Sequence, residues 1–183
     1  FDGTNDYVNL GNNFNSVFTG ANWSLSAWIN VTTNTSYDCF FSKGSPVQFY
    51  VHSNKIKIWL ESSSGYLTNM NSFDSTSTLS LDTLYHIVFT RSGDANILYI
   101  NGVSDATATS SGSVKESTTV ASIGIYGTGS YPFQGNIDEV ALWDTVLLPS
   151  EVTTLYDNSI PYDATNVQND NLKGYWRNDG TGT

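Results

Sequence analysis

The chain has 183 residues, enough for one domain with a hydrophobic core of its own. Its formal net charge is −10, with only seven Lys and Arg residues, which argues against a nucleic-acid partner and against binding to an anionic membrane surface. No apolar run is long enough to cross a bilayer, so we expect no membrane insertion. Cys39 is the only cysteine, so the chain has no pair of cysteines for an internal disulfide.

Strands dominate the expected secondary structure, because apolar and polar residues alternate along most of the chain. The expected strands are, in chain order, Asp6–Leu10, Ser24–Val31, Cys39–Ser42, Val47–His52, Lys55–Glu61, Tyr85–Arg91, Ile97–Ile100, Val120–Ile125, Ile137–Trp143 and Leu172–Arg177. Of these, Tyr85–Arg91 is strongly apolar, which predicts a central strand that is covered on both faces. Asn101-Gly102 predicts a type I′ hairpin turn, because both central residues of that turn need a positive φ. One helix is expected over Pro149–Tyr156, where apolar residues recur with a helical period and the proline suits the first turn.

Many short strands and a single helix predict an all-β fold, a two-sheet antiparallel β-sandwich with one short helix. No linker divides the sequence, so we expect residues 1–183 to form one domain, with residues 171–177 as a terminal strand. The abrupt start at Phe1 and the polar end predict that this domain is excised from a longer protein.

Five groups of residues follow one another in an order that is typical of a known fold family. They are Phe1-Asp-Gly-Thr-Asn-Asp-Tyr-Val-Asn-Leu10, Trp23-Ser-Leu-Ser-Ala-Trp-Ile29, Phe41-Ser-Lys-Gly44, Leu84-Tyr-His-Ile-Val88 with Leu98-Tyr-Ile-Asn-Gly102, and Phe133-Gln-Gly-Asn-Ile-Asp-Glu-Val-Ala-Leu-Trp143 with Leu148-Pro-Ser-Glu-Val152. The ordered set resembles the laminin-G-like branch of the concanavalin A-like lectin/glucanase superfamily, and it implies a jelly-roll sandwich. That fold carries lectins, hydrolases, receptor-binding modules and spacers, so the resemblance says less about function. One departure is Leu148, where the family usually has a Ser or Thr helix cap worth about 1 kcal/mol.

Aspartates near two strand starts are candidate metal ligands. Asp6 and Asp138 share the parity of the apolar residues that follow them on their strands, so both are expected to point inward. The family resemblance implies a structural Ca²⁺ held by Asp2, Asp6 and Asp138 with backbone carbonyls, and hard oxygen ligands in an acidic protein suit that ion. The alternative is that these carboxylates accept hydrogen bonds from backbone N–H groups and order their loops.

Aromatic residues are the candidate ligand-binding residues, because sugar rings stack their C–H faces on exposed aromatic rings. Trp59 lies on the polar parity of its strand, between Lys57 and Glu61, and is expected to face solvent. Tyr126 and Tyr131 lie in a Gly-rich loop that could border a groove. The alternative for the tyrosines is ordinary packing, since a sandwich buries many aromatics.

No catalytic motif is visible, so we expect no enzyme. Glycosidases need two carboxylates that flank the scissile bond, whereas Asp138 and Glu139 are adjacent and are expected to face opposite sides. His86 lies within an apolar strand, as a core histidine does.

The sequence therefore predicts a non-catalytic, lectin-like carbohydrate-binding module of an extracellular, cell-surface or virion protein, with a glycan or polysaccharide as partner. The alternative is a structural or protein-interaction module, such as an adhesion domain or viral fibre that binds a protein receptor. A glycoside hydrolase or polysaccharide lyase is less favoured, because neither the paired carboxylates nor another catalytic motif is present.

Overall fold

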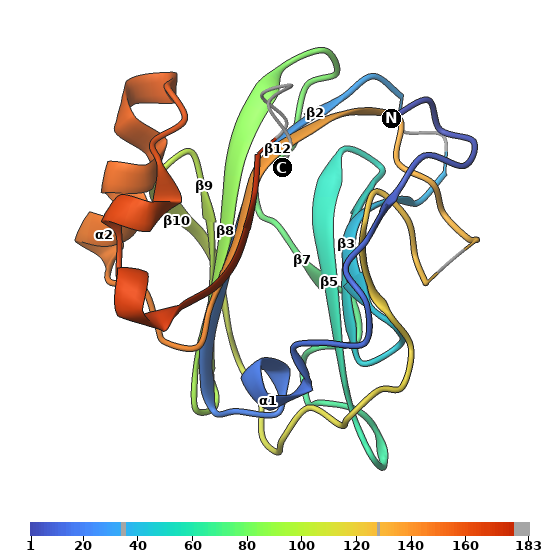
Figure 1. Ribbon diagram of the computed structural model, residues 1–183, viewed down its shortest axis with the longest axis vertical. Coiled ribbons are helices and arrows are strands. Elements are labelled where there is room, and N and C mark those ends of the chain that lie inside the picture. Colours follow the sequence, from blue (N-terminus) through green and yellow to red (C-terminus); the bar gives the residue numbers. More distant parts are fainter. Residues whose placement is uncertain (34–35, 128, 178–183) are drawn as a thin grey trace.

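Two antiparallel sheets face each other in the computed structural model, which describes residues 1–33, 36–127 and 129–177 (Figure 1). Within these residues one sheet has the order β1-β11-β3-β4-β5-β6, with β7 also paired to β5. Its strands are β1 (Val8–Asn9), β11 (Ala121–Ile123), β3 (Asp38–Lys43), β4 (Val47–His52), β5 (Lys55–Ser62), β6 (Gly65–Tyr66) and β7 (Phe73–Asp74). The other sheet has the order β10-β9-β8-β2-β12-β13. Its strands are β10 (Val103–Thr109), β9 (Ala95–Ile100), β8 (Leu84–Ser92), β2 (Asn22–Val31), β12 (Gly135–Trp143) and β13 (Leu172–Trp176).

The predicted sandwich and its short helix are confirmed, and α2 (Pro149–Tyr156) has the predicted bounds. The described residues also contain a one-turn helix, α1 (Asn15–Phe18), and three 3₁₀ turns (Asp157–Ser159, Ala164–Asn166 and Asn169–Asn171). The sequence did not predict α1, β6, β7 or β10. None of the helices described here is both long and apolar enough to span a membrane.

Alternation along each strand separates a core face from an outer face. On β4, Val47, Phe49 and Val51 are buried between the sheets. Gln48 and Tyr50 point to the opposite side, because successive side chains of a strand face opposite ways. This face of the seven-stranded sheet lies away from the core, so core packing does not dictate which residues occupy it.

The other sheet is covered on its outer face by α2 and the turns that follow it (Figure 1). Val152 and Leu155 of the helix pack with Trp143, whose indole N–H donates a 2.9 Å hydrogen bond to the Val167 carbonyl. Leu148 has no side chain that can cap the helix, but its backbone N–H donates to Glu151 Oε2 at 2.7 Å. Glu151 thus supplies half of a capping box and replaces part of the missing cap.

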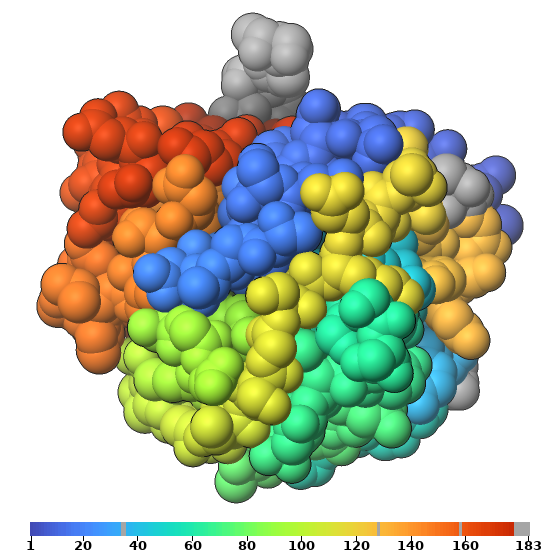
Figure 2. Space-filling model, turned by 90° about the horizontal axis from the view of Figure 1, so that it is seen from below, coloured from blue at the N-terminus to red at the C-terminus, as the bar shows by residue number. Residues whose placement is uncertain are grey.

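One end of the sandwich is closed by the segment 110–120. In Figure 2 this segment (yellow) crosses the face between the blue N-terminal segment and the teal strands. Lys43, almost fully buried, holds the closure together, since its Nζ donates to the Thr119 carbonyl (2.6 Å), the Ser117 carbonyl (3.0 Å) and Asn12 Oδ1 (2.6 Å).

Candidate functional site

An aromatic pocket lies on the outer face of the seven-stranded sheet. Its described lining residues come from β4, β5, β6 and the segments before β3 and β12, and they are Tyr37, Gln48, Tyr50, Trp59, Tyr66 and Tyr131. The hollow measures about 230 Å³. Small-molecule pockets commonly range from about 300 to 1,000 Å³, so this one suits a single ring with its neighbour lying outside.

Strand register brings the residues of the pocket floor together. Gln48 of β4 is directly opposite Trp59 of β5, and Tyr50 is opposite Lys57. Side chains that face each other across antiparallel strands lie within contact distance. The Tyr50 hydroxyl donates a 2.8 Å hydrogen bond to Gln48 Oε1, which fixes both polar groups at the floor.

Four aromatic rings cover Tyr50 from above. Its ring centre lies 4.8 Å from that of Trp59, 5.6 Å from Tyr37, 5.7 Å from Tyr131 and 6.5 Å from Tyr126. Tyr50 is therefore only 1% exposed although it faces away from the core. The rings meet at steep or tilted angles, as aromatic clusters prefer.

Backbone hydrogen bonds fix the main chain of the pocket wall. The Tyr131 carbonyl accepts a hydrogen bond from the Cys39 N–H at 3.0 Å, and the Tyr126 N–H donates to the Ser130 carbonyl at 2.8 Å. Tyr131 has a φ of 55° and leaves 47% of its surface exposed. The Tyr131 ring is thus presented to solvent from a fixed main chain.

Tyr37 is fixed from its other side by His52. The two rings are stacked with centres 3.9 Å apart, and His52 Nδ1 lies 3.2 Å from the Ser36 carbonyl oxygen.

The pocket is uncharged, but a buried carboxyl lies next to it in sequence. Burial raises the pKa of the Tyr50 hydroxyl. Burial and, to a smaller extent, the nearby charge of Glu61 raise the pKa of the Tyr126 hydroxyl, so both hydroxyls stay protonated at neutral pH. Asp38, which follows Tyr37, is 2% exposed. Burial raises the pKa of Asp38 to about 6, while a hydrogen bond from the backbone of Gln134 opposes the rise.

The structure brings together most of the aromatic residues singled out from the sequence. Trp59 and Tyr131 line the pocket, and the Tyr126 ring centre lies 6.0 Å from that of Tyr131, at the border. Sequence reasoning missed Gln48 and Tyr50. The alternation of β4 carried the signal for both, because it places them on the same outer face as Trp59 once β4 and β5 pair.

The three predicted calcium ligands do not gather. Within the described ranges, no group of three or more carboxylate, imidazole or thiol side chains could hold a metal ion. The Asp6 carboxylate accepts the Asp2 N–H at 3.0 Å, and the Asp2 carboxylate accepts the Thr4 N–H at 2.8 Å, so these aspartates order the first loop. Asp6 is exposed, and the expectation that it points inward is wrong because β1 begins only at Val8, itself 43% exposed.

Asp138 lies next to a β-bulge. The pairing of β12 with β2 shifts register between Asp138 and Ala141, and Glu139 has a φ of 49°. The bulge reverses the parity, so Asp138 faces the side opposite to Val140, and its carboxylate accepts the Glu139 N–H at 2.8 Å. The predicted three-aspartate set does not fit a calcium site, and the ion itself stays a prediction of the family resemblance.

A buried serine–histidine pair does not form a catalytic site. Ser26 Oγ lies 2.8 Å from His86 Nε2, but both residues are buried, and the His86 ring is stacked against Trp28 and Tyr156. Burial lowers the pKa of His86 to about 3, so the ring is neutral at pH 7. The histidine is a packing residue, as its position within an apolar strand suggests.

Residues 2–153 match the family described as the concanavalin A-like lectin/glucanase superfamily. The chain belongs to this superfamily. The match covers both sheets apart from β13, and it includes the whole aromatic pocket. No curated protein matches the chain in sequence.

Solved structures with this fold include carbohydrate-binding and receptor-binding domains. One is a candidate carbohydrate-binding protein from Bacteroides ovatus, with 18% identity and a TM-score of 0.77 over 99% of this chain and 52% of that protein. A second is domain 4 of AbnA, a GH43 extracellular arabinanase of Geobacillus stearothermophilus in complex with arabinotriose, with 22% identity and a TM-score of 0.59 over 75% of this chain and 68% of that one. A third is the binding domain of botulinum neurotoxin serotype D, with 18% identity and a TM-score of 0.60 over 83% of this chain and 40% of that one. This chain thus spans about half of the first protein, and at these identities the likeness shows the fold.

Proposed function

We propose that the chain is a non-catalytic carbohydrate-binding module, and that a sugar ring binds in the aromatic pocket. The observation that carries the proposal is the pocket itself, in which Trp59, Tyr131 and Tyr66 present aromatic surface next to unused polar groups. Aromatic faces stack on the C–H faces of sugars, and a few hydrogen-bonding groups then fix the orientation.

The chemistry of the lining supports binding rather than hydrolysis. The described residues that line the pocket include no carboxylate, imidazole or thiol. Glycoside hydrolysis uses two carboxylates on either side of the scissile bond. The domain of AbnA that holds arabinotriose shows that this fold can carry a sugar site within a larger extracellular protein. We propose the same setting here, a module of a secreted, cell-surface or virion protein.

Affinity electrophoresis tests the proposal directly. The chain is run through gels that contain laminarin, arabinoxylan, arabinan, galactan or hydroxyethylcellulose, and we expect at least one of them to retard it. Trp59→Ala should abolish the retardation. Lys55→Ala is the matched control, since Lys55 lies on the same face of the same strand but does not line the pocket. Absence of retardation by every glycan tried, here and in the anionic set below, would refute the proposal and favour a protein-binding role.

A further inference from the structure

The polar groups of the pocket are uncharged and many are unused. Within the described part of the chain, the hydroxyls of Tyr37, Tyr66 and Tyr131 and the indole N–H of Trp59 make no hydrogen bond. Hydroxyls both donate and accept, and an indole N–H only donates. Such a set matches sugar hydroxyls, which also donate and accept.

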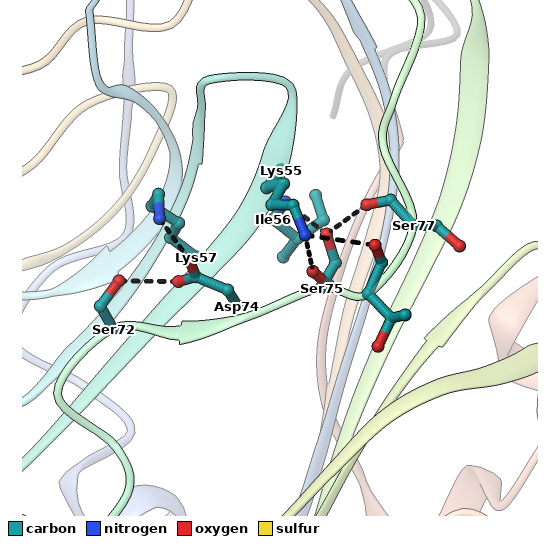
Figure 3. Close-up of polar contacts among 8 residues, drawn as sticks. Lys55, Ile56, Lys57, Ser72, Asp74, Ser75 and Ser77 are labelled. Carbon is teal, nitrogen blue, oxygen red and sulfur yellow. Dashed lines mark hydrogen bonds and ion pairs between the residues drawn. The ribbon is translucent and has the colours of Figure 1, made fainter.

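The cations nearest along the strand are already engaged. Lys57 Nζ forms an ion pair with Asp74 at 2.5 Å, and the Ser72 hydroxyl donates to the same carboxylate (Figure 3). Lys55 Nζ donates to the carbonyls of Ser75 (2.7 Å) and Thr76 (3.2 Å). Figure 3 shows that both lysines reach toward the segment that contains β7. Neither is left to receive an anion in the pocket.

The carboxylate at the far end of β5 is also neutralised. Glu61 pairs with Lys115 at 2.6 Å, so a cationic ligand would have to displace that lysine. An anionic ligand would meet the opposite problem, since the chain carries a net charge of −10. A charge that leaves water for an uncharged pocket without a partner loses much of its hydration energy.

We infer that the pocket takes an uncharged sugar and discriminates against uronic acids, sialic acids and amino sugars with a free amine. The inference rests on the proposed function and names the class of sugar for the same site. The pocket discriminates because it offers no opposite charge. A charged sugar would lose hydration on binding and would gain no ion pair in return. The binding of the uncharged sugar should also be nearly independent of salt, since no ion pair forms.

Matched pairs of probes test the inference. Neutral hydroxyethylcellulose, galactan and lactose are compared with anionic carboxymethylcellulose, polygalacturonate and 3′-sialyllactose, and chitosan represents the cationic class. Retardation in gels and titration calorimetry are measured at 20 mM and 500 mM NaCl. We expect binding only among the neutral members, a change in affinity below about twofold between the two salt concentrations, and a loss of at least about tenfold in Trp59→Ala.

The failures of the two proposals are distinguishable. Binding of an anionic or cationic member that is lost in Trp59→Ala, or that weakens strongly with salt, would overturn the neutral-sugar inference and leave the carbohydrate site in place. Binding of none of these probes, and of no polysaccharide in the first set, would overturn both. Introducing a charge at the rim gives a second measurement. Tyr131→Lys should convert the pocket to bind the anionic member of a pair, whereas an unchanged preference would show that the missing counter-charge is not what selects the ligand.

Discussion

Truncation of Tyr131 separates the binding role of the pocket from its contribution to stability. Tyr131 is 47% exposed, so about half of its surface is buried against Tyr37, Tyr50 and Tyr126. A fully covered aromatic side chain buries roughly 200 Å², and half of that at about 25 cal/mol per Å² gives about 2.5 kcal/mol. Because the unfolded chain is itself partly compact, we expect Tyr131→Ala to lower the free energy of unfolding by about 1–2 kcal/mol.

The same substitution should reduce binding of the retained polysaccharide by about tenfold, equivalent to about 1.4 kcal/mol. Urea denaturation measures the first quantity and titration calorimetry the second. Tyr7→Ala is the matched control, because Tyr7 is 40% exposed and does not line the pocket. It should lose similar stability and keep full affinity. Unchanged binding by folded Tyr131→Ala, or an equal loss in Tyr7→Ala, would refute the assignment of the pocket.

Four further predictions concern stability. Lys43→Met removes the amine that donates hydrogen bonds to three oxygens, and it should lower the free energy of unfolding by roughly 2–4 kcal/mol in urea denaturation. Lys55→Met, at a partly exposed lysine, should lower it by less than about 1 kcal/mol. Equal losses in the two variants would contradict the role of the buried amine. The pKa of Asp38 is about 6 in the folded chain, against 3.8 ordinarily, so ionisation of this buried carboxyl destabilises the fold as the pH rises from about 4 to 7. In melts across this range, Asp38→Asn should lose on the order of 1 kcal/mol less stability than the unchanged chain does. Identical pH profiles of the two proteins would contradict this role of Asp38. Glu151→Ala removes the acceptor of the Leu148 N–H and should cost about 0.5–1 kcal/mol by the same denaturation, and no change would show that the helix start needs no cap. The calcium ion that the family resemblance implies should stabilise the fold, so addition of chelator should lower the melting temperature, whereas an unchanged melting temperature would refute the structural ion.

The sequence predicts the core strands well because burial imposes a strict period on them. β4 has the predicted bounds Val47–His52, and the turn at Asn101 and Gly102 has the predicted positive φ values of 52° and 78°. β10 was missed, since all its residues after Val103 are small or polar and the strand lies at the edge of its sheet. The hairpin turn nevertheless required a partner strand for β9, and that requirement was the signal for β10.

The parity of Asp138 shows where a period-2 argument fails. One extra residue in β12 reverses the direction of every side chain before it, and Glu139 takes the left-handed conformation that the bulge requires. Sequence reasoning expects Gly or Asn at such a φ, so a glutamate gave no warning. An error of one residue thus moved Asp138 to the wrong face and joined it to Asp2 and Asp6, although no group of three such side chains forms among the described residues.

The aromatic pocket could be foreseen only in part, because it depends on pairing as well as on parity. Trp59 could be placed on an outer face from its own strand alone. Tyr37, Tyr66 and Tyr131 lie in short or irregular segments, and they reach Trp59 only because β3, β4, β5 and β6 are consecutive neighbours and the segment after β11 lies beside β3.

The position of the cluster is the strongest reason to assign it a function. The core already fills the opposite face of β4 and β5, with Phe49, Ile56 and Ile58 fully buried there. Polar residues on the outer face would serve the sandwich as well and would keep it more soluble. Tyr50 can still be explained by stability, because the other rings bury it, whereas Tyr66 and Tyr131 are each 47% exposed and their outer halves stabilise nothing in the free chain. Those exposed halves, next to unused hydroxyls, are the part of the pocket that the proposed ligand would cover.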